Sequence, residues 1–177
     1  APFLLALSPT LRPRLPSLCR GALLAVSAYV LFSGANRLRA ESVLSRSLAE
    51  ADASYELFPE PLGPHRWRAV VRSEGRYRLF LLRSLSGSAE PRGEVATSPD
   101  DPAVRRARES AVGRQLEAFF RAPVWSSDPE PDGTLVGAYD LRFQSLLLGP
   151  KKLLPFRFHV ADDGTVEALG WLGRRKR

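Results

Sequence analysis

Hydrophobic residues gather at the start of the chain in two runs. The first occupies residues 1–7 and leads into a stretch interrupted by proline and arginine. The second run, Gly21–Asn36, contains no charged residue. We interpret residues 1–17 as the end of one membrane segment and a loop that precede a membrane helix. Because the chain contains no methionine, even at position 1, we expect it to be the C-terminal portion of a larger membrane protein.

The second run predicts a transmembrane helix with a helical extension over residues 18–54. Leu18–Leu38 has the roughly 20 residues that are needed to span a bilayer, and Arg20 and Arg37 can reach toward opposite head-group layers. Two alternatives remain, a buried helix of a soluble protein and a signal peptide with small residues at Ser33–Ala35. Arginines flank both ends of the run, so the sequence does not indicate which side of the membrane holds the rest of the chain.

Beyond this helix the pattern changes to short runs that are typical of strands. Three prolines and a glycine predict a proline-rich linker over residues 55–66. In the soluble domain, residues 67–173, aliphatic and aromatic side chains recur in runs bounded by turn residues, which predicts strands. Asp163 and Gly164 lie between the last two runs and are a strong hairpin signal. The five expected strands are Trp67–Val71, Tyr77–Leu82, Leu135–Phe143, Phe156–Val160 and Thr165–Leu172.

One amphipathic helix is expected between the second and third strands. Asp101 is a good N-cap, Pro102 fits the first turn, and apolar residues follow at helical spacing as far as residue 122. Residues 87–99 and 126–133 on either side are polar and rich in turn residues, which predicts loops. The order of elements predicts an α+β fold, in which a small antiparallel sheet of about five strands is covered on one face by this helix.

The charge of the chain is basic, with 26 lysines and arginines against 19 acidic residues. The arginines are scattered among acidic residues, which argues against nucleic-acid binding, and residues 174–177 form a basic tail. Arginines beside the apolar run suit phospholipid head groups. Membrane lipids and upstream membrane helices of the same protein are the expected partners, and no nucleic acid is expected. Cys19 is the only cysteine and says nothing firm about the redox compartment.

Side chains with catalytic potential do not form a known motif in this sequence. The histidines, His65 and His159, lie in different elements without metal-ligand spacing, and we interpret both as ordinary residues. The carboxylate pairs Asp100–Asp101 and Asp162–Asp163 are interpreted as a helix cap and a hairpin turn. The sequence contains neither a Gly-x-Ser-x-Gly elbow nor a glycine-rich phosphate loop. We therefore expect no catalytic residue and no metal ligand in this chain.

Two short strings hold the candidate structural or contact residues, Arg66 and Trp67 in the first and Asp140 and Arg142 in the second. Residues two apart in a strand project from the same face. Asp140 can therefore pair with Arg142, or it can hold an arginine such as Arg68 across the sheet. A structural ion pair is the first interpretation, and a contact with a substrate or subunit is the second.

These strings resemble the C-terminal region of the YdjM-like proteins, which are bacterial inner-membrane metal-dependent hydrolases. The resemblance extends over residues 1–172. It implies a location in the bacterial inner membrane and a catalytic divalent metal such as zinc, held by histidines in the N-terminal membrane part. Those histidines are absent here, so no catalytic residue carries over. The resemblance is carried by Pro64, Arg66, Trp67, Val70, Val71, Tyr77, Asp140–Phe143, Phe156, Phe158 and Val160.

Three functions remain open at this point. The first is the C-terminal part of a membrane-bound metal-dependent hydrolase, with its metal site upstream of this chain. The second is a non-enzymatic membrane-anchored module that binds a partner or stabilises an assembly. The third is a secreted domain, released by cleavage near Ala35 or Ala40 if the apolar run is a signal peptide.

Overall fold

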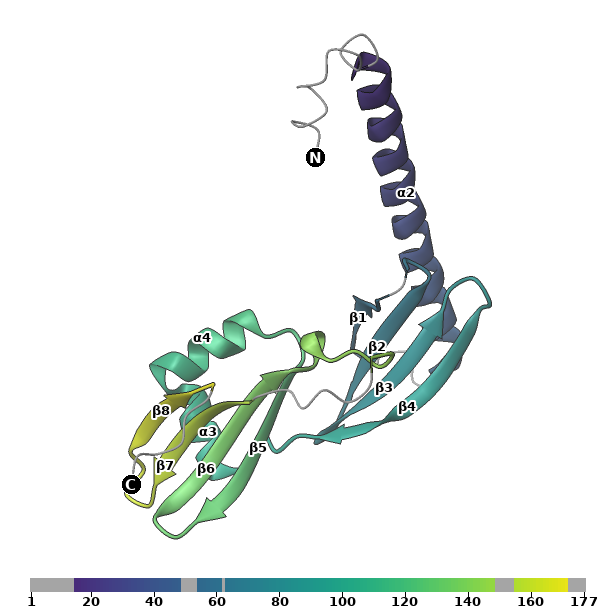
Figure 1. Cartoon of the computed structure of the whole chain (residues 1–177). Coiled ribbons are helices and arrows are strands. Elements are labelled where there is room, and N and C mark those ends of the chain that lie inside the picture. Colours follow the sequence, from purple (N-terminus) through teal and green to yellow (C-terminus); the bar gives the residue numbers. More distant parts are fainter. Residues whose placement is uncertain (1–14, 49–53, 62, 149–154, 172–177) are drawn as a thin grey trace.

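A computed structural model describes residues 15–48, 54–61, 63–148 and 155–171 of this chain. Figure 1 shows a long N-terminal helix that leads into two sheets, with short helices beside the second sheet. The described residues form two antiparallel sheets of four strands each. The fold is therefore α+β with an N-terminal apolar helix, as predicted, but the strands are divided between two sheets. The expected earlier membrane segment and the basic tail lie outside the described residues.

The N-terminal helix, α2 (Leu15–Ser47), has two parts with different surroundings. Side chains in its first two-thirds are exposed, for example Leu24 at 71%. Its last turns instead bury Ala40, Val43 and Leu44. Within the described part of the chain, α2 is the helix that is long and apolar enough to cross a membrane.

The first sheet contains four strands in chain order. The strands are β1 (Tyr55–Pro59), β2 (Arg66–Ser73), β3 (Arg76–Arg83) and β4 (Ser88–Ala96). The central pair, β2 and β3, confirms the two strands predicted here. One face of the sheet packs against the end of α2, where Leu44 meets Trp67 and Leu82.

The two outer strands of this sheet correct the sequence analysis. β1 lies inside the predicted linker, because Tyr55–Phe58 pairs with β2 and proline follows only at the end of the strand. β4 replaces the loop predicted over residues 87–99. It is an edge strand that carries Pro91 and Gly93 and is largely exposed, so its residues resemble those of a loop. Proline and charged residues are common on edge strands, which they protect against pairing with other chains.

The second sheet also has its strands in chain order. The strands are β5 (Pro123–Glu130), β6 (Gly133–Asp140), β7 (Phe156–Ala161) and β8 (Val166–Gly170). The hairpin between β7 and β8 confirms the Asp-Gly signal, and Gly164 has a φ of 88°, which glycine adopts readily. β5 corrects the loop predicted over residues 126–133. The predicted third strand ends at Asp140, because Leu141–Phe143 forms a short 3₁₀ helix, η2.

The predicted helix over residues 102–122 is two helices, α3 (Pro102–Glu109) and α4 (Ala111–Phe119). Asp101 caps α3 as predicted, since its carboxylate accepts from the N–H groups of Ala103 and Val104. Ser110 has an extended backbone and separates the two helices. Its hydroxyl accepts from the N–H of Gly113, so the same residue ends α3 and caps α4. The helices cover the second sheet through a core that includes Val104, Ala107, Trp125, Val136 and Phe158.

The two sheets meet through a third hydrophobic core. Phe58, Val70 and Tyr77 of the first sheet pack against Ala122, Val124 and Leu141 of the second half. The phenol of Tyr77 also donates to the carbonyl of Pro123 at 2.9 Å. The first sheet is therefore covered by α2 on one face and by the second half of the chain on the other.

Candidate functional site

The predicted contact residues separate into two places. Trp67 is buried in the core beside α2, and its indole N–H donates to the carbonyl of Pro64 at 2.9 Å. Arg66 is half-buried at the start of β2. Asp140 and Arg142 lie instead at the end of β6, where the two sheets meet. The structure therefore does not bring the two strings together as one site.

Asp140 holds the chain at the junction between the two sheets. Its buried carboxylate accepts from the backbone N–H groups of Arg121 at 2.9 Å, Ala122 at 3.2 Å and Arg142 at 2.8 Å. It also lies 3.5 Å from Nε of Arg142. The expected pair of Asp140 and Arg142 does form. It forms across the start of η2 rather than on one face of a strand, because the strand ends at Asp140.

Arg68 lies near Asp140, but its ion-pair partner is Glu60, at 3.2 Å. Burial lowers the pKa of the Arg68 guanidinium, while Glu60 and then Asp140 act to raise it. Arginine stays protonated under such conditions because its ordinary pKa is so high. Arg68 also donates to the carbonyl of Arg142 at 3.0 Å.

Glu60 completes this buried network and was missed by sequence analysis. Its carboxylate accepts from the hydroxyl of Ser145 at 2.6 Å and the N–H of Leu146 at 3.1 Å. It lies in the predicted linker, where a single acidic residue among prolines was the only signal. The network joins segments far apart in the sequence and positions the two sheets, which is a structural role.

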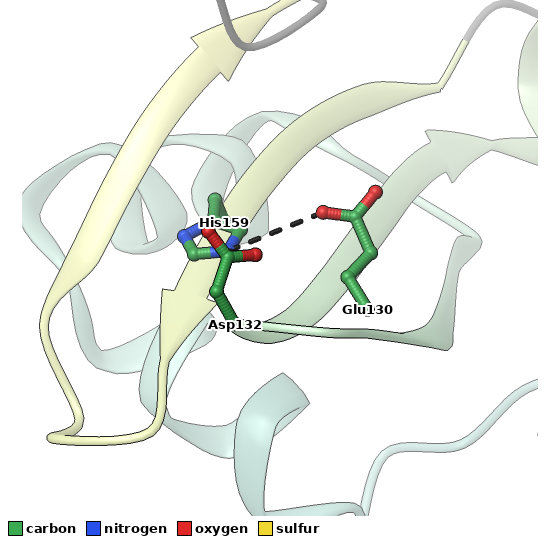
Figure 2. A group of neighbouring side chains, drawn as sticks. All are labelled: Glu130, Asp132 and His159. Carbon is green, nitrogen blue, oxygen red and sulfur yellow. Dashed lines mark ion pairs between the residues drawn. The ribbon is translucent and has the colours of Figure 1, made fainter. Parts of the chain in front are cut away.

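A different group of side chains has the composition of a metal site. Glu130, Asp132 and His159 offer one ligand atom each, and these atoms all lie within 4.8 Å of one another. Nε2 of His159 is 3.4 Å from Oδ1 of Asp132 and 4.0 Å from Oε2 of Glu130. Figure 2 shows the two carboxylates directed toward the imidazole. The imidazole is buried, whereas both carboxylates are exposed.

Two adjacent elements position this group. The carboxylates come from the tip of the β5–β6 hairpin, where Glu130 pairs with Gly133 across a two-residue turn. His159 lies on β7, paired with Leu135 of β6. Gly133 has a φ of 147°, and a Cβ there would lie 2.2 Å from the carbonyl oxygen of Val160. Glycine therefore allows the hairpin tip to approach β7 closely.

His159 lies on a strand, as predicted from the sequence, but its acidic neighbours were not predicted. The acidic residues precede it by more than 25 positions, and only the pairing of β6 with β7 brings them together. The one available signal was the Pro-Glu-Pro-Asp-Gly turn, which was interpreted as a loop. His65 remains an ordinary residue in the turn before β2.

A cavity of about 200 Å³ lies between the first sheet and the helices of the second half. Three of its charged residues, Arg72, Arg108 and Glu117, have partners within the wall. Arg108 and Glu117 form a bidentate pair at 3.1 and 3.2 Å, and the indole N–H of Trp125 donates to Glu117 at 2.7 Å. Arg72 donates to the phenol of Tyr77 at 3.2 Å. These contacts describe a polar packing region rather than a nucleophile beside a base.

An aromatic surface surrounds Arg142. Its guanidinium carbon lies 4.7 Å from the ring centres of both Phe119 and Phe143, within the range of cation–π contacts. Both rings are 57% exposed, and their centres are 6.4 Å apart. This surface is defined here by Phe119, Arg142 and Phe143, at the end of α4 and in η2.

Comparison of the chain with protein-family models, with curated proteins and with solved structures found no match in any of the three.

Proposed function

We propose that the chain is a non-enzymatic, membrane-anchored binding or assembly module, in which α2 crosses the bacterial inner membrane. The observation that carries this proposal is the division of α2 into an exposed apolar part and a buried end. Leu18–Leu38 would extend about 30 Å as a helix, which matches the hydrocarbon core of a bilayer. Apolar side chains that are exposed on every side of a helix, as in the first part of α2, are unfavourable in water but favourable in lipid.

The end of α2 supports a fixed attachment of the two sheets. Ala40, Val43 and Leu44 pack into the core of the first sheet. At the edge of this core the hydroxyl of Ser84 donates to Oδ1 of Asn36 at 2.5 Å, and both residues are buried. Asn36 is the last residue of the apolar run, so this contact lies where the run ends. The side chain of Asn36 also donates to the carbonyl of Phe32. The soluble part thus begins directly at the expected membrane surface.

The aromatic surface is joined to the first sheet through Arg68, the third residue of β2. The guanidinium of Arg68 donates to the carbonyl of Arg142. In the sheet, Arg68 lies opposite Leu81 of β3, which is three residues before Ser84. Figure 1 shows α4 at the end of the second sheet that faces the side toward which α2 extends, and η2 follows β6 at that end. Aromatic rings and arginine are favoured at the head-group layer of a membrane. Membrane lipids are therefore the partner that we propose for Phe119, Arg142 and Phe143.

Membrane extraction of the expressed full chain tests the anchor. We expect the protein to stay in the membrane pellet after alkaline carbonate and to keep its full mass. Leu24→Arg places a charge in the middle of the apolar run, which costs about 3 kcal/mol or more in lipid, and should release a large fraction. Ser45→Arg, at an exposed position of the same helix beyond the apolar run, is the matched control and should not. Release of the unaltered chain, or a product cleaved near Ala35, would contradict the proposal.

A second candidate is the C-terminal part of a YdjM-like metal-dependent hydrolase. What supports it is the resemblance, whose residues include Trp67 in the core beside α2 and Asp140 at the junction of the sheets. The test is the gene sequence upstream of the Ala1 codon. Further apolar helices with a histidine cluster would favour this candidate, and metal-dependent hydrolysis by the encoded protein would establish it.

A further inference from the structure

We propose that Glu130, Asp132 and His159 form a binding site for a divalent transition-metal ion of the zinc class. The site does not depend on the proposed membrane function. It lies at the tip of the β5–β6 hairpin, whereas the junction near α2 is at the Asp140 end of β6. Gly133 and Asp140 are seven positions apart along β6, which corresponds to about 23 Å. Figure 1 shows this hairpin on the side away from α2.

The distances between the ligand atoms fit one bound ion. Zinc lies about 2.1 Å from nitrogen and oxygen ligands, so two ligands of a tetrahedral ion are about 3.4 Å apart. Nε2 of His159 and Oδ1 of Asp132 are 3.4 Å apart, and Oε2 of Glu130 is 4.0 Å from the same nitrogen. All three ligand atoms lie within 4.8 Å of one another, and rotation of the exposed Glu130 side chain can bring its carboxylate nearer to the other two.

The fold restricts the imidazole more than the carboxylates. His159 is 2% exposed and lies on β7 between β6 and β8. Its Nε2 nevertheless points toward the two carboxylates at the surface (Figure 2). The close approach of Gly133 to Val160 fixes the hairpin that carries the carboxylates. A fixed imidazole and a fixed turn reduce the entropy that ion binding costs.

The types of ligand indicate the class of metal. An imidazole with two carboxylates suits zinc and its neighbours in the first transition row, whereas calcium and magnesium prefer oxygen ligands alone. Two negative charges also neutralise a divalent ion. A set of three side chains leaves a coordination position for water or for a group from another molecule.

Zinc titration of the full chain in detergent tests this inference. The background is Cys19→Ser, which removes the thiol as a competing ligand. We expect one equivalent of Zn²⁺ to bind with a dissociation constant of about 10 µM or tighter, and a rise in the unfolding temperature. Co²⁺ should give the visible absorption of a nitrogen- and oxygen-ligated ion, and excess Mg²⁺ should not displace it.

Variants assign the binding to these three residues. Glu130→Gln with Asp132→Asn should weaken Zn²⁺ binding by about 100-fold or more, while circular dichroism confirms that the chain stays folded. Glu74→Gln in the β2–β3 turn removes a comparable exposed carboxylate and should leave the affinity unchanged. His159→Gln should abolish the Co²⁺ spectrum. The inference would be overturned if the Cys19→Ser protein did not bind Zn²⁺, or if the double variant bound Zn²⁺ equally well.

Discussion

Arg68 and Glu60 form an ion pair of 3.2 Å between side chains that are only 2% and 0% exposed. Glu60 precedes β2 and Arg68 lies within it, and their further hydrogen bonds reach Arg142, Ser145 and Leu146 beyond β6. A buried pair of this kind gains strength from the low dielectric but loses the hydration of both charges. It therefore specifies how the two halves of the chain meet more than it adds to stability.

Removal of one member of this pair should strongly destabilise the protein. We expect Glu60→Gln to lower the free energy of unfolding by about 3–5 kcal/mol, because Arg68 stays buried without its countercharge. The double variant Glu60→Leu with Arg68→Met should lose less stability than Glu60→Gln, because it buries no unpaired charge. Denaturant unfolding in detergent measures both. Glu94→Gln breaks the exposed pair with Arg76 and should change stability by about 1 kcal/mol or less.

Truncation of Leu44 should loosen the attachment of α2 to the first sheet. Leu44 is fully buried among Leu57, Trp67 and Leu82, so Leu44→Ala should cost about 2–5 kcal/mol. The fluorescence of Trp67 reports the change, because its ring lies in the same core. Leu31→Ala removes the same atoms from the exposed part of the helix. An equal loss of stability in both variants would contradict the docking described here.

The cap of α3 should make stability depend on acid pH. Partial desolvation acts to raise the pKa of Asp101, but hydrogen bonds from Ser127, Val104 and Ala103 lower it below its ordinary value. Because the folded-state pKa is the lower one, the stabilisation is complete above about pH 4 and is lost as the pH falls through the folded value.

Asp101→Asn should therefore flatten the loss of stability below about pH 4, while the amide still caps the helix. Thermal unfolding between neutral and acid pH measures the difference from the unaltered chain. Asp100→Asn is the matched control, since Asp100 is an exposed neighbour. If the two variants gave the same pH profile, the cap would not be the source of the dependence.

A spin label on the aromatic surface should detect lipid. In a Cys19→Ser background, Phe143→Cys carries a nitroxide at the end of η2. We expect this label in bilayers to be more accessible to oxygen, which concentrates in lipid, than to a water-soluble nickel chelate. The control is Glu74→Cys, at the far end of the β2–β3 hairpin from the Asn36–Ser84 contact. A water-like profile at both positions would exclude lipid contact by this surface.

Local patterns in the sequence were sufficient for the elements that carry strong local signals. The apolar helix, the hairpin of β2 and β3, the Asp163–Gly164 turn and the Asp101 cap each depend on residues close together in the chain. Strands β1, β4 and β5 were not predicted, because they contain prolines or polar residues. These strands exist because they pair with a neighbouring strand, and such pairing is not visible in local composition.

The candidate sites show the same limit. Asp140 and Arg142 were identified because they are two positions apart, whereas Glu60 was missed because its ion pair with Arg68 needs the chain to fold back and its hydrogen-bond donors lie near residue 145. The group of Glu130, Asp132 and His159 exists only through the pairing of β6 with β7. Sequence spacing detects metal ligands on one helix or in one loop, but not ligands from a turn and a later strand.

In the proposed membrane-anchored arrangement, the unbroken course of α2 would link the thickness of the membrane to the position of the two sheets. A helix whose apolar part exceeds the bilayer tilts until its length fits. Because the last turns of α2 are packed into the first sheet without a break in the helix, any such tilt would rotate both sheets as one body relative to the membrane plane. The distance from the lipid surface to the tip of the β5–β6 hairpin would then depend on the lipid composition around α2.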